Sequence, residues 1–148
     1  MAKQKTTPIQ TVNPYRFKVT QGTLNSVSSA YELVTFNTVV FDPNNNFSTA
    51  NKRYTIPVSG YYLFSGDVSY AGGAAVGRTG SVLYTNAALT HWGDFAYSAA
   101  SQTSRRPFMV YDYFTAGQTV EIHGFCDSTQ NTEVDANRTW FTGFLVHV

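Results

Sequence analysis

Residues 61–70 alternate between two faces as a β-strand does, and this pattern constrains the fold more than any other feature of the chain. One face carries Tyr62, Phe64, Gly66, Val68 and Tyr70. Because alternate side chains of a strand point in opposite directions, this face is expected to lie on a core. The opposite face begins with Tyr61 and Leu63 and then turns polar. It is therefore expected to meet a second surface over its first half only.

From residue 15 onward the chain predicts further strands, because no stretch keeps a 3.6-residue apolar period long enough for a helix. Strands are expected at residues 36–41, 54–58, 81–84, 108–114 and 119–126. The segment Asp42-Pro43-Asn44-Asn45 is typical of a type I turn, and Ala116-Gly117-Gln118 of a tight turn. Residues 71–80 predict a flexible loop and residues 127–137 a polar one, while residues 86–104 indicate no clear element.

The C-terminal segment 140–148, WFTGFLVHV, is apolar on both faces of the strand that it predicts. One face carries Trp140, Phe144, Val146 and Val148, and the other carries Phe141, Gly143 and Leu145. A strand that is apolar on both sides is buried on both sides. One side is expected to face the core, and a neighbouring subunit is the simplest cover for the other.

Length and composition indicate a single domain with much covered surface. Residues 1–14 are polar and contain Pro8 and Pro14, so they form either a disordered tail or an arm that docks on a partner. The remaining residues, 15–148, suit one domain. Aromatic residues make up 16% of the chain and charged residues only 13%, which favours sheets with covered faces.

The net charge and the N-terminal residues limit which partners and which cellular compartment are expected. The net charge of +1 provides no strong field for nucleic acid or anionic lipid, and the pair Arg105–Arg106 is expected at a solvated strand end. No apolar run has the length of a membrane span. The first residues lack the apolar core of a secretion signal, so we expect a protein made in a cytoplasm.

Motifs for catalysis are missing from the sequence. It has no G-x-S-x-G elbow, no S-x-x-K and no P-loop, and it therefore predicts a protein that is not an enzyme. The single cysteine, Cys126, excludes an internal disulfide. Strand parity puts Cys126 and His123 on opposite faces, so this H-x-x-C pair predicts no metal site, and no cofactor is expected. For the acidic loop, calcium held by Asp127, Glu133 and Asp135 is the alternative to plain solvation.

A candidate for ligand or partner contact lies at His91-Trp92-Gly93-Asp94 and Tyr97. In a loop, Trp92 and Tyr97 can stack on sugar rings or anchor a protein contact. The alternative is a tryptophan folded back onto the end of the barrel.

An ordered set of motifs resembles the C1q/TNF-like jelly-roll family over residues 15–148. Residues 54–65, YTIPVSGYYLFS, resemble the signature strand of C1q-like domains, in which an aromatic and a proline precede G-x-Y-x-F. Residues 114–120, FTAGQTV, are similar to the family's hairpin, and residues 140–145, WFTGFL, resemble its closing strand. Without a collagen-like stretch or a secretion signal, the chain looks more like a stand-alone phage or bacterial member than an animal one.

The resemblance implies an all-β fold, a single antiparallel jelly-roll sandwich that assembles as a homotrimer about a threefold axis. In that arrangement Tyr62 and Phe64 point into the barrel. The trimer interface is then expected to comprise Tyr61, Leu63, Phe141 and Leu145, a parity that a one-residue slip would invert.

Two function hypotheses follow from these expectations. The first is a non-enzymatic trimeric virion protein of a tailed phage, such as a capsid decoration protein, which is assembled in the host cytoplasm and binds a capsid or another virion protein. The second is a receptor- or glycan-binding module, such as a tail-fibre tip or a bacterial surface lectin, which uses Trp92 and Tyr97. Neither hypothesis involves nucleic acid or a membrane.

Overall fold

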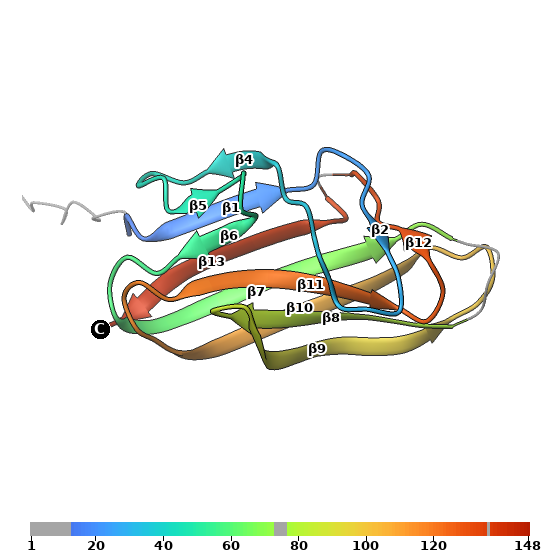
Figure 1. Ribbon diagram of the computed structural model, residues 1–148. Helices are drawn as coiled ribbons and strands as arrows, with labels where there is room; N and C mark the ends of the chain where they lie inside the picture. Colours follow the sequence, from blue (N-terminus) through green and yellow to red (C-terminus); the bar gives the residue numbers. More distant parts are fainter. Residues whose placement is uncertain (1–12, 73–76, 136) are drawn as a thin grey trace, which may run out of the picture.

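Two antiparallel sheets pack face to face in the computed structural model, which describes residues 13–72, 77–135 and 137–148 (Figure 1). The first sheet has the strand order β10 (Ser104–Phe114), β7 (Gly60–Tyr70), β13 (Trp140–His147), β1 (Arg16–Thr20) and β4 (Thr38–Phe41). The second has the order β5 (Phe47–Ser48), β6 (Arg53–Thr55), β11 (Thr119–Cys126), β8 (Gly77–Thr85) and β9 (Ala88–Ser98). Strand β3 (Glu32–Leu33) pairs with β11, and β2 (Ser26–Val27) pairs with β12 (Gln130–Asn131).

No helix occurs among the described residues, and the predicted all-β fold is confirmed. Of the arm predicted for residues 1–14, residues 1–12 lie outside the described part of the chain. The loop predicted for residues 71–80 is wrong from Gly77 onward, where β8 begins. Strand β9 fills residues 88–98, where the sequence indicated no element. The small and polar residues of these strands have weak strand propensity, and pairing within the sheet decides their conformation.

The C-terminal strand β13 lies in the middle of the first sheet, between β7 and β1 (Figure 1). Its register places Phe141 opposite Gly66 and Phe144 opposite Leu63. Since Gly66 belongs to the inward face of β7, Phe141 points into the sandwich and is fully buried there. Leu145 likewise packs against the core. The expectation that Phe141 and Leu145 line a subunit interface is therefore wrong, because both side chains point inward. The neighbouring residue Phe144 points outward instead.

Aromatic rings from both sheets form the centre of the core. The Phe17 ring of β1 stacks on the Tyr54 ring of β6 with centroids 4.2 Å apart, which joins the two sheets directly. Phe141 meets Phe17 edge to face at 4.8 Å, and Phe64 meets Phe114 in the same way at 5.1 Å. Such pairs stabilise a core by about 0.5–1.5 kcal/mol each beyond the burial of their area. The predicted core face of β7 is confirmed, because its four side chains other than Gly66 are fully buried: Tyr62, Phe64, Val68 and Tyr70.

Both predicted turns are present. The backbone N–H of Asn45 donates to the carbonyl of Asp42 (3.2 Å), and the N–H of Phe47 donates to the Asp42 carboxylate (2.7 Å). Between β10 and β11, Gly117 has a φ of +88°, which only glycine adopts without strain. Its N–H donates to the carbonyl of Ile56 (2.8 Å), so this turn is tied to the segment that precedes β7.

Replacing Phe141 by alanine is expected to lower the free energy of unfolding by about 3–5 kcal/mol, because it opens a cavity among the rings of the core. The matched control is Phe144→Ala on the same strand, which removes an outward ring and should cost much less. Urea denaturation of the two variants and the wild type, at one protein concentration, measures the difference. Equal losses would contradict the observed parity of β13.

Candidate functional site

The outer face of the first sheet is rich in exposed aromatic and aliphatic side chains. The strand registers align Tyr61 with Tyr113, Leu63 with Tyr111 and Phe144, and Ser65 with Met109. The exposed fraction is 38% for Tyr61, 39% for Phe144 and 74% for Met109, which is high for such side chains. We call this surface the assembly face and define it by the following residues: Tyr61, Leu63, Met109, Tyr111, Tyr113, Phe144 and His147.

Tyr61 is the centre of the assembly face. Its ring stacks on Tyr111 at 5.6 Å and on His147 at 4.7 Å, and it meets Tyr113 edge to face at 5.4 Å. The Tyr111 hydroxyl and the His147 Nε2 are hydrogen-bonded at 3.1 Å. The rings are thus held in one arrangement before any partner binds, and contiguous exposed patches of this kind mark interaction surfaces.

Two of the four residues expected at a subunit interface, Tyr61 and Leu63, do lie on this outward face. Met109, Tyr111 and Tyr113 of β10 were missed. The signal for them was present, because residues 108–114, FMVYDYF, are apolar on both faces in the same way as the C-terminal strand.

Trp92 and Tyr97 lie on strand β9 of the second sheet and not in a loop, which corrects the sequence-based expectation. Trp92 is 62% exposed and Tyr97 76%, so Trp92 is not folded back onto the barrel. The Trp92 ring contacts Tyr31 edge to face at 5.8 Å and lies 5.3 Å from Phe95. Both predicted contact residues are therefore exposed on the second sheet, whereas the assembly face belongs to the first.

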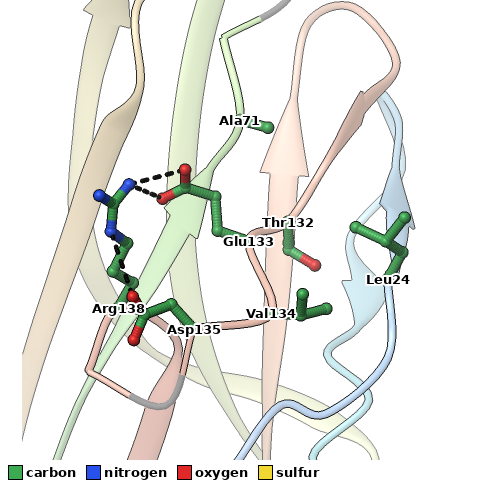
Figure 2. Close-up of a pocket in the computed structure, with 7 residues that line it drawn as sticks. All are labelled: Leu24, Ala71, Thr132, Glu133, Val134, Asp135 and Arg138. Carbon is green, nitrogen blue, oxygen red and sulfur yellow. Dashed lines mark hydrogen bonds and ion pairs between the residues drawn. The ribbon is translucent and has the colours of Figure 1, made fainter.

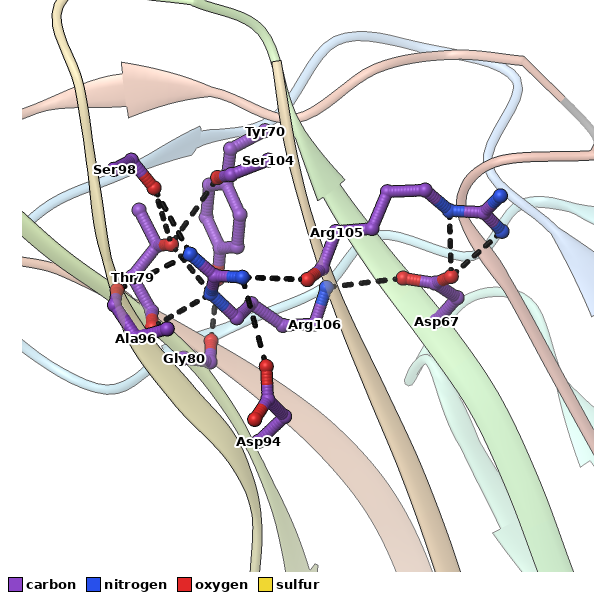
Figure 3. A network of polar contacts seen from close by, with 10 residues as sticks. All are labelled: Asp67, Tyr70, Thr79, Gly80, Asp94, Ala96, Ser98, Ser104, Arg105 and Arg106. Carbon is purple, nitrogen blue, oxygen red and sulfur yellow. Dashed lines mark hydrogen bonds and ion pairs between the residues drawn. The ribbon is translucent and has the colours of Figure 1, made fainter. Parts of the chain in front are cut away.

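Arg106 is buried between the two sheets, with 7% of its surface exposed, and the expectation of a solvated arginine pair is wrong for this residue. Figure 3 shows its guanidinium reaching from β10 to β8 and β9. The Nε donates to the carbonyl (3.0 Å) and the hydroxyl (2.7 Å) of Thr79, and Nη2 donates to the carbonyl of Ala96 and the hydroxyl of Ser98. Asp94 forms an ion pair with Nη1 at 3.5 Å. Strand alternation alone turns Arg106 inward.

The neighbouring Arg105 points the other way and pairs with Asp67, whose carboxylate also accepts from the backbone N–H of Arg106 (3.1 Å) (Figure 3). Burial raises the pKa of the Asp67 carboxyl, and the charge and hydrogen bonds of Arg105 offset part of that effect. Burial also raises the pKa of Tyr70, whose hydroxyl donates to the carbonyl of Gly80 (2.6 Å). The hydrogen bonds of these buried side chains are thus made within the protein, which is typical of a structural network.

An open pocket of about 370 Å³ lies beside the loop that precedes β13 (Figure 2). Leu24, Ala71 and Val134 form its apolar part, and Arg138 forms its polar side with both Glu133 oxygens, at 2.7 and 2.8 Å. Burial acts to raise the pKa of Glu133, but the hydrogen bonds from Arg138 and Ser69 outweigh it and the pKa is lowered. The ionised pair neutralises this wall of the pocket.

A second open pocket, of about 280 Å³, lies between β9 and β10. His91 Nε2 lies 3.0 Å from Asp112 Oδ2, and His91 Nδ1 lies 3.1 Å from the Thr90 hydroxyl. That hydroxyl also donates to the carbonyl of Leu83 (3.3 Å). The Thr90 hydroxyl lies 3.0 Å from the Thr85 hydroxyl as well, so the Leu83 carbonyl, the Thr85 hydroxyl and His91 Nδ1 compete for its single proton.

The three carboxylates considered for calcium are engaged by arginines. Asp127 pairs with Arg78, whereas Glu133 and Asp135 both pair with Arg138 (Figure 2). Across the described ranges, no three His, Cys, Asp or Glu side chains come together as a metal-binding group. The predicted parity of β11 is confirmed, since Cys126 is in the core while His123 stacks on Tyr84.

No segment of the described residues forms a helix of the length and hydropathy needed to cross a membrane.

Two packed antiparallel sheets, with the C-terminal strand between the first strand and β7, define a jelly-roll domain. Residues 16–146 match the model of the C1q domain family, and the chain belongs to that family. Domains of this family are generally non-enzymatic binding modules.

Solved structures give the same fold. The globular domain of a zebrafish complement 1qA protein is 21% identical, with a TM-score of 0.68 over 90% of this chain and 98% of that one. The Eiger TNF of S. frugiperda is 11% identical, with a TM-score of 0.72 over 90% and 92%. Murine APRIL is 8% identical, with a TM-score of 0.65 over 89% and 98%. No curated protein matches the chain.

Replacing Arg106 by methionine is expected to lower the free energy of unfolding by about 3 kcal/mol or more, because several buried acceptors on β8 and β9 lose their donor. The matched control is Arg78→Met, which breaks the exposed pair with Asp127 and should have a much smaller effect. Denaturant unfolding measures both. If the two variants are equally stable, the Arg106 network does not hold the sheets together.

Proposed function

We propose that this chain is a homotrimeric, non-enzymatic structural and binding protein whose subunits associate through the assembly face. The observation that carries the proposal is the exposed aromatic cluster around Tyr61, which lies on a single face of a folded domain. A sheet face of this composition needs a cover. Homotrimers are the usual assembly of C1q and TNF domains, and another copy of the chain is therefore the proposed cover.

Tyr111→Asp is expected to convert the trimer into a soluble monomer. The side chain is exposed in the monomer and its loss leaves the core intact, whereas a trimer would have to bury an unpaired carboxylate at three equivalent places. Val134→Asp is the matched control, because Val134 is similarly exposed but lies at the pocket beside β13. Light scattering measures the mass of each variant. A Tyr111→Asp protein that keeps the mass of the wild-type trimer would refute this interface.

The proposed setting of the trimer is the virion of a tailed phage, where it decorates the capsid. A closed threefold assembly matches the symmetry of threefold capsid sites, so that one trimer can make three equal contacts. With a net charge of +1, the chain has no strong field to attract a partner, and three equal contacts per trimer can supply the affinity instead.

Purified trimer is expected to co-sediment with empty shells of the phage that encodes it, and to saturate at a fixed ratio to the shell protein. The Tyr111→Asp monomer should bind much more weakly, because it loses two of three linked contacts. Saturation of sites is followed by gel densitometry of the pellet. Trimer that stays in the supernatant at every concentration would exclude the capsid role.

The second candidate is a receptor- or glycan-binding function, and the observation in its favour is the exposure of Trp92 and Tyr97 on the second sheet. Large aromatic side chains are among the residues that dominate binding energy at interfaces. The proposed glycan contact and the assembly face belong to different sheets and share no residue.

A further inference from the structure

Five aromatic residues gather on the outer face of the second sheet, and we call this surface the aromatic platform. It consists of Tyr31, Trp92, Phe95, Tyr97 and Phe125. Tyr31 lies 5.3 Å from Phe125, and Phe125 lies 5.8 Å from Phe95. With the contacts of Trp92 to Tyr31 and Phe95, four of the five rings form a closed circuit in which each ring limits the movement of the next. Tyr97 is placed on the same face by its register with Arg78.

The platform is fitted closely to the sheet beneath it. The Phe95 ring lies over Gly80 of β8, and a Cβ at that position would come within 2.2 Å of the ring. Glycine is therefore required at residue 80 if Phe95 is to lie against the backbone. Val82, opposite Trp92 in the register, is fully buried although it lies outside the core cluster. The platform thus covers the outer face of the sheet, and within it the side chains of Trp92 and Tyr97 remain exposed to solvent.

One neutralised ion pair borders the platform. Arg78 Nε and Nη2 each lie 3.2 Å from an oxygen of Asp127, and the Arg78 guanidinium also lies over the Phe125 ring at 5.6 Å. The hydrogen bonds with Asp127 raise the pKa of Arg78, and those from Arg78 lower the pKa of Asp127, so both stay ionised. The platform therefore offers donors and acceptors side by side without net charge.

The shape of the platform selects an extended ligand. A β-bulge between them keeps Trp92 and Tyr97 on one face, opposite Val82 and Arg78, and the four-residue span on β8 separates them by about 13 Å. They lie on a sheet face, and neither residue lines either of the two pockets described above. A small molecule would be little buried here, whereas a chain of rings could contact both side chains at once.

We propose that the aromatic platform binds a neutral polysaccharide chain, with pyranose rings stacked on Trp92 and Tyr97. The apolar face of a pyranose matches an exposed aromatic ring, and its equatorial hydroxyls match the paired donors and acceptors of Arg78 and Asp127. A basic peptide would need an unpaired carboxylate, and an acidic ligand would need an unpaired cation. This inference rests on the second candidate function and gives it a ligand class. In a trimer, three such platforms on one particle would raise the avidity for a polymer.

The test is affinity electrophoresis of the full-length protein through gels that contain one polysaccharide each. The probes are a soluble β-1,4-glucan, a β-1,3-glucan, a galactomannan and a dextran, with alginate as the acidic comparison. At least one neutral polymer is expected to retard the wild type, while alginate does not. Trp92→Ala should weaken that retardation about tenfold or more, since a stacked ring and its trivalent repetition are lost together.

The matched control is Phe41→Ala, which removes an exposed ring from the first sheet and should bind like the wild type. A second readout uses Trp140→Phe, which leaves Trp92 as the sole tryptophan. Its fluorescence should shift when the retarding polymer is added, and the shift should vanish in the Trp92→Ala protein.

The platform is overturned if no neutral polysaccharide retards the trimer, or if Trp92→Ala binds as the wild type does. Retardation by alginate alone would also overturn it and would indicate an electrostatic site. Light scattering separates this result from the assembly proposal: a trimer that binds none of the polymers leaves assembly standing, whereas a monomer that binds one leaves the platform standing.

Discussion

The double pairing of β13 is the constraint on which the rest of the structure depends. The last strand of the chain lies between β1 and β7, so the first sheet is continuous only when both ends of the chain have come together (Figure 1). Phe141 then reaches the centre of the aromatic core, and its contact with Phe17 connects β13 through Tyr54 to the second sheet. The same register turns Phe144 outward, which places it beside Tyr61 and Leu63 on the assembly face. One strand thus supplies both the core and the outer surface.

The two ends of the sandwich are held by different physics. Near the start of β7 the core is aromatic, and the sheets are joined by stacked rings. Near the end of β7 the joint is polar: Arg106 bridges from β10 to Thr79 and Ser98, while Asp67 binds Arg105 and the backbone of Arg106 (Figure 3). A buried guanidinium is stable only when its donors are satisfied, and this one finds acceptors on two strands of the opposite sheet. A chain with only 13% charged residues therefore places some of its few charges inside.

The two exposed aromatic surfaces divide between the two sheets, so that assembly and ligand binding are proposed for different residues. The assembly face belongs to β7, β10 and β13, whereas the aromatic platform is built on β8, β9 and β11 with Tyr31. The two surfaces share no residue. The proposed polysaccharide site therefore adds a function to the proposed trimer without competing for the same residues, and both roles fit a protein that binds through rigid, preformed surfaces.

The sequence by itself determined the fold class, because alternation in residues 61–70, the Gly117 turn and the ordered motifs of the C1q domain family each depend on local pattern. It also singled out Trp92 and Tyr97 as contact candidates, but it left open a tryptophan folded back onto the barrel and placed both residues in a loop. Only the tertiary structure decided the facing of Phe141, the burial of Arg106 and the gathering of Tyr31, Phe95 and Phe125 into one platform. When both faces of a strand are apolar, the sequence does not indicate which face points into the core. The register with a partner strand that is distant in sequence decides it.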